Sequence, residues 1–317
     1  MEELLSRCLE ASLVLMSALG ALKRGVWVRG SPECLLVGGT YRPFTNGVYL
    51  PGGPVGGVDK HVQELGEFLA SQERNNGSFC IHLFAHSLAS ELPARAFLQS
   101  QEEFWRRHGE FLARLETYSL MVLDLQHYKQ HQTPSEAPLH LRKVQSREDV
   151  RQYWEVMVDA FEHGPRTVLE EEIEAFYHLH ETNSFPGMYN EYLGEIESGQ
   201  GSSVVCCGRV IELCLPFLRQ MDAEILGPLV DWIEEFAGTC QIPANFRFLC
   251  IFAVGTKAPF KRQGYASALL RQLIEDAHHH GATHVGLASS EEGSGVYRKL
   301  GFLPVGKQMS LLAFKPC

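Results

Sequence analysis

The feature that most constrains this chain is a hydrophobic strand pattern, a loop and a long amphipathic helix pattern in succession. Residues Phe248–Val254 predict the strand, and helical spacing of apolar residues predicts a helix over 265–279. A glycine at 264 lets the backbone approach a bulky anion and adopt unusual dihedral angles. The free N–H groups and positive dipole end of the helix then form a diphosphate site. The expected phosphate-binding residues are Lys261, Arg262, Gln263, Gly264, Tyr265 and Ala266.

This loop is neither a Walker A motif nor a dinucleotide fingerprint, because Gly-x-Gly-x-x-Gly is absent. A tight turn at a helix start with two solvated cations is the alternative interpretation. The residues that follow favour the phosphate interpretation. Ser289 and Ser290 come after a strand predicted at 284–288, and a Tyr-x-x-Leu-Gly-Phe ending follows at 297–302.

Charge and hydrophobicity exclude several classes of protein. Lys plus Arg is 28 and Asp plus Glu is 38, so the net charge is −10, and no basic stripe is visible. We therefore expect no nucleic-acid partner. A hydrophobic content of 45% indicates a folded chain. No run approaches the roughly 20 apolar residues that span a bilayer, and the acidic start at Met1–Glu3 does not resemble a secretory signal.

The 9 cysteines lack any C-x-x-C spacing. This usage is typical of buried free thiols in a reducing cytoplasm, so we expect a cytoplasmic protein without membrane contact. The adjacent Cys206 and Cys207 are expected to lie on opposite faces of a strand. The run His278–His280 is interpreted as a solvated helix end, because successive helix positions face different directions. We expect no metal site.

The segment 131–138 is polar, carries two prolines and lacks periodicity, which predicts a linker. It divides the chain into 1–130 and 139–317. Both halves mix helices and strands in a similar order, so we expect an α/β protein with a mixed sheet and two related units in tandem. The predicted helices are 4–22, 61–69, 104–115, 150–161, 168–180, 224–236, 265–279 and 294–300. The predicted strands are 26–28, 35–37, 48–50, 79–84, 119–125, 139–144, 192–196, 203–210, 248–254, 284–288, 303–305 and 309–314.

The two motifs together resemble the GCN5-related N-acetyltransferase superfamily over about 139–317. Its phosphate motif is a basic residue or Gln, two residues, Gly, one residue, then Gly or Ala. Lys261, Gly264 and Ala266 match that pattern, and Tyr297 and Phe302 belong to its later Tyr-x-x-Leu-Gly-Phe ending. The chain looks most similar to two-part members whose degenerate upstream half carries an Asn-Gly-Val segment and whose loop opens Val-x-Thr. Here these are Asn46–Val48 and Val254–Thr256.

This resemblance implies the acyl-CoA N-acyltransferase fold, with 1–130 as a degenerate N-terminal copy and 139–317 as the N-acetyltransferase domain. It also implies acetyl-CoA as acyl donor and the primary amine of a small molecule or protein as acceptor. The pantetheine arm would pair with the backbone of Phe252, Ala253 and Val254, and Ser290 would contribute to the cofactor site. Tyr297 would act as general acid toward the departing thiolate, since a phenol near its reference pKa of about 10 is protonated at neutral pH.

The sequence departs from the family pattern in three places. Lys261 stands where Arg is commoner, Ser290 stands where Asn is frequent, and the segment 213–244 replaces a short hairpin. That segment is either a lid over the acceptor or a helix packed on the sheet. The sequence also does not identify the general base, because the strand 248–254 carries no carboxylate. The alternatives are a water chain or one of Glu195, Glu212, Cys250, His284 and Glu291.

Two other functions compete with the enzyme hypothesis. A non-catalytic acyl-CoA-binding or regulatory module would explain the missing base, with the upstream half as a partner surface. A structural α/β protein with a vestigial site would bind no coenzyme A. The sequence does not indicate the acceptor, the acyl chain length or the oligomeric state.

Overall fold

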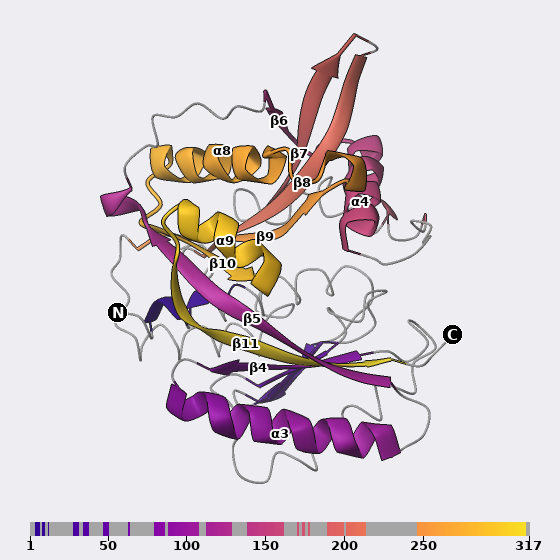
Figure 1. The fold of residues 1–317 in the computed structure, drawn as a ribbon, viewed down its shortest axis with the longest axis vertical. Helices are drawn as coiled ribbons and strands as arrows, with labels where there is room; N and C mark the ends of the chain where they lie inside the picture. Colours follow the sequence, from indigo (N-terminus) through magenta and orange to yellow (C-terminus); the bar gives the residue numbers. More distant parts are fainter. Residues whose placement is uncertain are drawn as a thin grey trace.

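The computed structural model describes residues 79–85, 88–107, 112–128, 138–161, 189–199, 201–213 and 246–314, with shorter stretches within 4–12, 28–37, 47–50 and 170–177 and at 63. These residues form one mixed sheet of eleven strands, in the order β1-β2-β3-β4-β11-β5-β10-β9-β8-β7-β6 (Figure 1). The predicted mixed α/β fold is therefore confirmed. Most of the linker and of the helices predicted at 61–69, 168–180 and 224–236 lies outside the described residues.

The N-terminal half contributes one end of the sheet. Strands β1 (Val28–Ser31), β2 (Cys34–Val37) and β3 (Gly47–Leu50) are antiparallel neighbours, and β3 runs parallel to β4 (Phe79–Ala85). Helix α3 (Leu88–Arg107) then leads into the long strand β5 (Leu112–Asp124), which a short 3-10 turn, η3 (Leu125–His127), ends.

The C-terminal half repeats this succession. Strands β6 (His140–Lys143), β7 (Tyr189–Ser198), β8 (Gly201–Leu213) and β9 (Phe248–Thr256) are antiparallel neighbours, with helix α4 (Arg147–Phe161) between β6 and β7. Strand β9 then runs parallel to β10 (His284–Ser289), to which helix α8 (Tyr265–His279) connects it. Helix α9 (Glu291–Lys299) leads into the last described strand, β11 (Leu303–Phe314).

The two halves exchange strands at the middle of the sheet. Strand β5 of the N-terminal half pairs with β10, whereas β11 of the C-terminal half pairs with β4. The exchanged strands β5 and β11 are antiparallel to each other over Leu303–Phe314, side by side through the centre of the molecule (Figure 1). Each half thus follows a parallel pair with a helix and then a strand that completes the sheet of the other half, in agreement with two related units in tandem.

Helices α3, α8 and α9 pack on one face of this sheet, the α8 face. Met309 and Leu311 of β11 join α3 in one buried cluster, and Met121 and Leu123 of β5 join α8 and α9 in another. Helix α4 covers the opposite face, the α4 face, with Cys207 of β8 in its core. The helical residues within 4–12 also lie on this face, because a Cβ on Gly286 would meet Leu9 and Phe248. Alternating side chains thus bury both faces.

The helix predicted at 104–115 was wrong. Helix α3 begins at Leu88 and ends at Arg107, and residues 112–115 start β5. Pro93 removes one backbone donor near the start of α3, which made the segment resemble a loop. The buried stripe reveals the true helix: Ala94, Phe97, Leu98, Gln101 and Trp105.

The two strands predicted at 303–305 and 309–314 are one strand, β11. Pro304 and Gly306 suggested a break. The pairing with β5 instead shifts by one residue between these two positions, so a bulge accommodates both inside a continuous strand.

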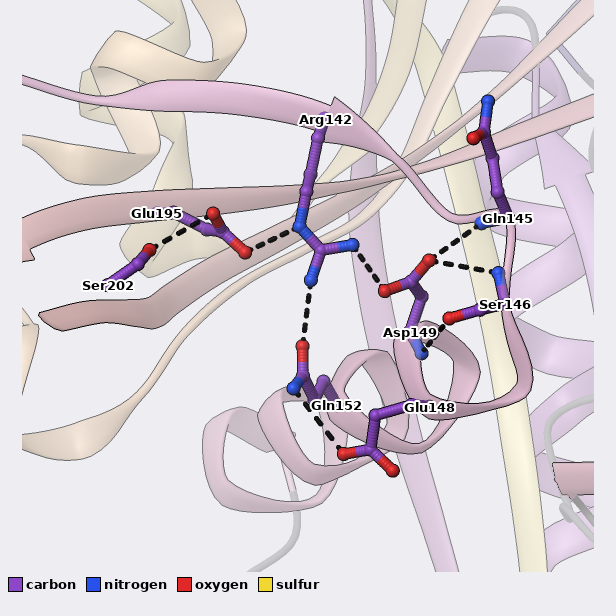
Figure 2. A network of polar contacts seen from close by, with 8 residues as sticks. All are labelled: Arg142, Gln145, Ser146, Glu148, Asp149, Gln152, Glu195 and Ser202. Atoms are coloured by element: carbon purple, nitrogen blue, oxygen red, sulfur yellow. Dashed lines mark hydrogen bonds and ion pairs between the residues drawn. The ribbon is translucent and has the colours of Figure 1, made fainter.

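The start of α4 is capped by two reciprocal hydrogen bonds. The backbone N–H of Asp149 donates to Ser146 Oγ (3.1 Å), and the N–H of Ser146 donates to Asp149 Oδ2 (2.9 Å). Figure 2 shows how Arg142 of β6 joins this cap to the sheet through Asp149, Gln152 of α4 and Glu195 of β7. The guanidinium therefore fixes α4 against β6 and β7.

No helix in the described part of the chain is long and apolar enough to cross a bilayer. The cysteine prediction is confirmed, since Cys206 belongs to the cluster under α8 and Cys207 to the cluster under α4. The histidine prediction is confirmed as well. His278 and His279 are exposed in the last turn of α8, and His280 Nδ1 lies 2.7 Å from the carbonyl oxygen of Asp276.

Candidate active site

The parallel strands β9 and β10 stop pairing before their carboxyl ends, which leaves a gap between them. Their last paired residues are Ile251 and Leu287, although β9 continues to Thr256 and β10 to Ser289. Beyond Ile251, β9 keeps its antiparallel neighbour β8 on one edge, and no described strand pairs with its other edge. An extended ligand arm can therefore hydrogen-bond to this edge as an added strand.

A bulge lies in this open part of β9. Arg209 of β8 pairs with Phe252 and Cys207 with Gly255, so Ala253 and Val254 together oppose one residue of β8. Ala253 has φ +52°, an uncommon value for a residue with a side chain. Its carbonyl oxygen accepts from the Cys207 thiol (Sγ–O 3.8 Å). The bulge turns backbone groups of 252–254, the segment predicted to hold pantetheine, out of the regular ladder.

The predicted phosphate loop lies at the start of α8. A 3-10 turn, η4 (Ala258–Phe260), precedes it, and the backbone is left-handed at Arg262 (φ +64°) and at Gly264 (φ +88°). The first backbone bond into the helix runs from the N–H of Ala268 to the carbonyl of Gly264 (2.9 Å). The N–H groups of 265–267 precede this ladder and are available to an anion at the positive end of the helix dipole.

The side chains of this loop have different surroundings. Lys261 Nζ donates to the carbonyl oxygen of Ala160 at the end of α4 (3.3 Å), and Gln263 Nε2 donates to the carbonyl oxygen of Pro259 (3.0 Å). Arg262 is exposed, and no acidic side chain among the described residues pairs with it. The backbone N–H groups of 265–267 and the Arg262 side chain are therefore more available to an anion than Lys261. Ala266 and Tyr265 are half-buried in the first turn of α8.

Helix α9 begins at the carboxyl end of β10. The Ser290 hydroxyl caps it by accepting from the N–H of Gly293 (3.2 Å), so this predicted cofactor residue already has a local structural partner. Tyr297 lies one turn further and packs edge-on against Phe302, with ring centroids 6.0 Å apart. Burial raises the pKa of Tyr297 to about 12. The phenol is therefore a proton donor throughout the neutral range.

Two of the residues considered as general base lie far from the bulge. His284 stands opposite Phe248 at the start of β10, five residues from Ala253, or about 17 Å along the strand. Glu212 stands opposite Leu249 and pairs with Arg247 (2.6 Å). The pKa of the Cys250 thiol is raised well above its ordinary value, chiefly by burial, which keeps it protonated.

The other two are engaged elsewhere or solvated. Glu195 holds Arg142 and accepts from Ser202 Oγ (3.1 Å), and it belongs to the network that fixes α4. Glu291 is exposed in the first turn of α9.

A buried ion pair beside the bulge was not foreseen from the sequence. Glu191 of β7 and Arg209 of β8 are 1% and 7% exposed, and Arg209 Nε donates to Glu191 Oε1 (2.9 Å). The Tyr189 hydroxyl donates to the same oxygen (2.7 Å), and the guanidinium stacks over the rings of Tyr189 and Tyr153. Arg209 lies directly opposite Phe252, so the cluster supports the strand next to the bulge on the α4 face.

Part of this chain is similar to a known family of proteins, and its fold is similar to that of solved structures. Residues 209–302, from Arg209 to Phe302, match the acetyltransferase (GNAT) family. Among solved structures, a GCN5-related N-acetyltransferase from Kribbella flavida aligns over 97% of this chain and 96% of its own, at 14% identity and a TM-score of 0.55. No curated protein matches the sequence.

Two further structures have the same fold over most of their length. A conserved protein of unknown function from Staphylococcus epidermidis covers 92% of this chain and 96% of its own, at 10% identity and a TM-score of 0.55. A tandem GNAT protein from the clavulanic acid biosynthesis pathway covers 90% of this chain and 79% of its own, at 12% identity and a TM-score of 0.52.

The chain therefore shares the fold of these GNAT proteins, in a two-part arrangement. Within this fold, the segment 209–302 that matches the GNAT family contains the bulge, the loop before α8 and Tyr297.

Proposed function

We propose that this protein is an acetyl-CoA-dependent N-acetyltransferase that acylates the primary amine of a small molecule or protein by direct attack on the thioester. The observation that supports the proposal is that three elements lie in or directly after the strands β9 and β10, which form the gap. These are the bulge at Ala253, the left-handed loop at Gly264 and the phenol of Tyr297.

Each element performs one part of the reaction. The N–H groups at the start of α8 and the Arg262 side chain bind the pyrophosphate. The open edge at 252–254 pairs with the pantetheine arm, and a backbone N–H at the bulge polarises the thioester carbonyl. The neutral amine nitrogen forms the C–N bond and releases one proton to solvent as the C–S bond breaks. Tyr297 gives its proton to the thiolate and is reprotonated from solvent.

Activity is tested by coenzyme A release from acetyl-CoA with spermidine, phenethylamine, glucosamine and a lysine-containing peptide. Wild-type protein should release thiol with at least one amine, and Tyr297→Phe should lower kcat about 100-fold or more. Calorimetry should show acetyl-CoA binding to both proteins with similar Kd. Binding without turnover on any amine would instead support a non-catalytic acyl-CoA-binding module, and no binding at millimolar coenzyme A would refute both.

A further inference from the structure

The acceptor amine has one direction of approach left to it, if the proposed function holds. Helices α8 and α9, with the phosphate loop and Tyr297, occupy the α8 face of the sheet. An acyl-CoA seated there presents its thioester through the gap between β9 and β10. The amine must then attack from the α4 face, so a base should project from that face near the carboxyl end of β10.

Strand β5 of the N-terminal half reaches this place. Its pairing with β10 ends where Ser119 opposes Ser289, and β5 extends beyond that row by residues 112–118. Ala253 of the bulge and Ser289 each lie two residues beyond the last pair of β9 and β10, Ile251 and Leu287. Residues 112–118 of β5 therefore extend past the carboxyl end of β10, on the side toward which the gap opens.

Two polar residues of this extension lie on the α4 face. Tyr118 and Glu116 oppose Gln308 and Ser310 of β11. Directly opposed residues share a face of the sheet. The alternate residues of β11, Met309 and Leu311, pack against α3 on the other face. The Glu116 carboxylate, about 10 Å along β5 from Ser119, thus projects to the side from which the amine must come.

The surroundings of Glu116 suit a base that is fixed in place. Its side chain is 16% exposed, and its Oε1 lies 3.0 Å from Arg114 Nε. Its Oε2 accepts from the Tyr118 hydroxyl. The pKa of Tyr118 is raised, first by burial and then by Glu116, so the phenol stays a donor. A carboxylate has about four acceptor positions, so two contacts leave room for an ammonium.

We propose that Glu116, supplied by the N-terminal half, is the general base that deprotonates a cationic primary amine in the site of the C-terminal half. The carboxylate binds the ammonium and takes one proton, and the neutral nitrogen attacks the thioester carbon. The tetrahedral adduct loses a second proton to water as the C–S bond breaks, and Tyr297 protonates the sulfur. Release of the proton from Glu116 and reprotonation of Tyr297 from solvent leave amide, thiol and one net proton.

The test compares Glu116→Gln with Glu103→Gln in the full-length protein, using acetyl-CoA and the most active amine of the panel. Glu103 is an exposed carboxylate on α3 of the same half, paired with Arg107. Glu116→Gln should lower kcat/KM about 100-fold or more and remove the acidic limb of the pH–rate profile, while Glu103→Gln should match wild type. The Kd of acetyl-CoA should be unchanged in both. Tyr118→Phe should have a smaller effect, since the phenol only positions the carboxylate.

Two further measurements separate a chemical role from a structural one. A fluorinated ethylamine, which is already neutral at the assay pH, should show a much smaller deficit in Glu116→Gln than spermidine does. Glu116→Asp should recover part of the rate that Glu116→Gln loses. If Glu116→Gln also lowers Tm, the rate of Glu116→Asp decides between a chemical and a structural role. Wild-type-like turnover by Glu116→Gln, in a wild type that is active, overturns this inference and leaves the proposed function standing. Absence of turnover by wild type overturns both.

Discussion

Ser119 of the N-terminal half lies directly opposite Ser289 of the C-terminal half, in the last row where β5 pairs with β10. That row is also where the gap between β9 and β10 opens. The border between the two halves therefore runs alongside the candidate active site and not away from it.

Separating the two halves should destroy both the border between them and the candidate active site. We expect fragment 139–317 to be insoluble or molten alone, because β10 and β11 would each lose a neighbouring strand and expose an edge. Co-expression with fragment 1–130 should restore a soluble complex that binds acetyl-CoA, as measured by co-purification and calorimetry. A fragment 139–317 that folds by circular dichroism and binds acetyl-CoA alone would contradict this prediction.

The phosphate site should depend on the backbone at Gly264 more than on the charge at Lys261. Gly264→Val should weaken acetyl-CoA binding more than tenfold, since φ +88° costs a branched side chain about 1–2 kcal/mol and the side chain obstructs the anion. Lys261→Ala should weaken binding only about twofold, because Nζ is bonded to the carbonyl of Ala160. Gly281→Val is the matched control. It has φ +81° at the other end of α8, and it should lower Tm without changing the Kd.

The buried ion pair predicts a strong asymmetry between single and double variants. Arg209→Met should lower the free energy of unfolding by about 3–5 kcal/mol, because Glu191 keeps a buried charge without its main partner. Adding Glu191→Gln to that variant should recover part of the loss. Arg107→Met, which breaks the exposed pair with Glu103, should change stability by less than about 1 kcal/mol in urea denaturation.

Tyr297 should make the protein less stable in strong alkali. Its pKa is about 12 in the fold because of burial, against about 10 in an unfolded chain, so the folded state holds the proton more tightly. Its contribution, on the order of 3 kcal/mol, is complete below pH 10 and is lost as the pH rises through 12. Urea denaturation between pH 9 and 12 should therefore show a shallower decline for Tyr297→Phe than for wild type. Parallel declines would show that the phenol is not buried in solution.

Local patterns were enough to predict the core of the site. The strand 248–254 and the helix 265–279 match β9 and α8, because long apolar runs and helical spacing are local signals. The phosphate interpretation of the loop between them depends on Gly264, the helix start and the later Tyr-x-x-Leu-Gly-Phe ending, and it stays a prediction. The roles of Tyr297, Ser290 and 252–254 stay predictions, because no bound ligand tests them.

Non-local pairing could not be predicted in the same way. Nothing within residues 112–124 indicates that this strand lies between β10 and β11, since strand partners far apart in sequence leave no local pattern. The pair of Glu191 and Arg209 illustrates a smaller obstacle. A regular hairpin closed at Ser198 and Gly201 would place Glu191 opposite residue 208. The irregularity between Gly194 and Glu195 shifts the partner to Arg209.

The exchanged strands also determine the order in which the sheet can form during synthesis at the ribosome. Strand β5 emerges long before β10, its neighbour on one side, and β11, its neighbour on the other. While most of the second half is synthesised, β4 and β5 therefore lack the strands of that half that pair with them in the complete sheet. Such a nascent chain needs protection from aggregation, because its sheet is complete only when residues 303–314 pair with β4 and β5.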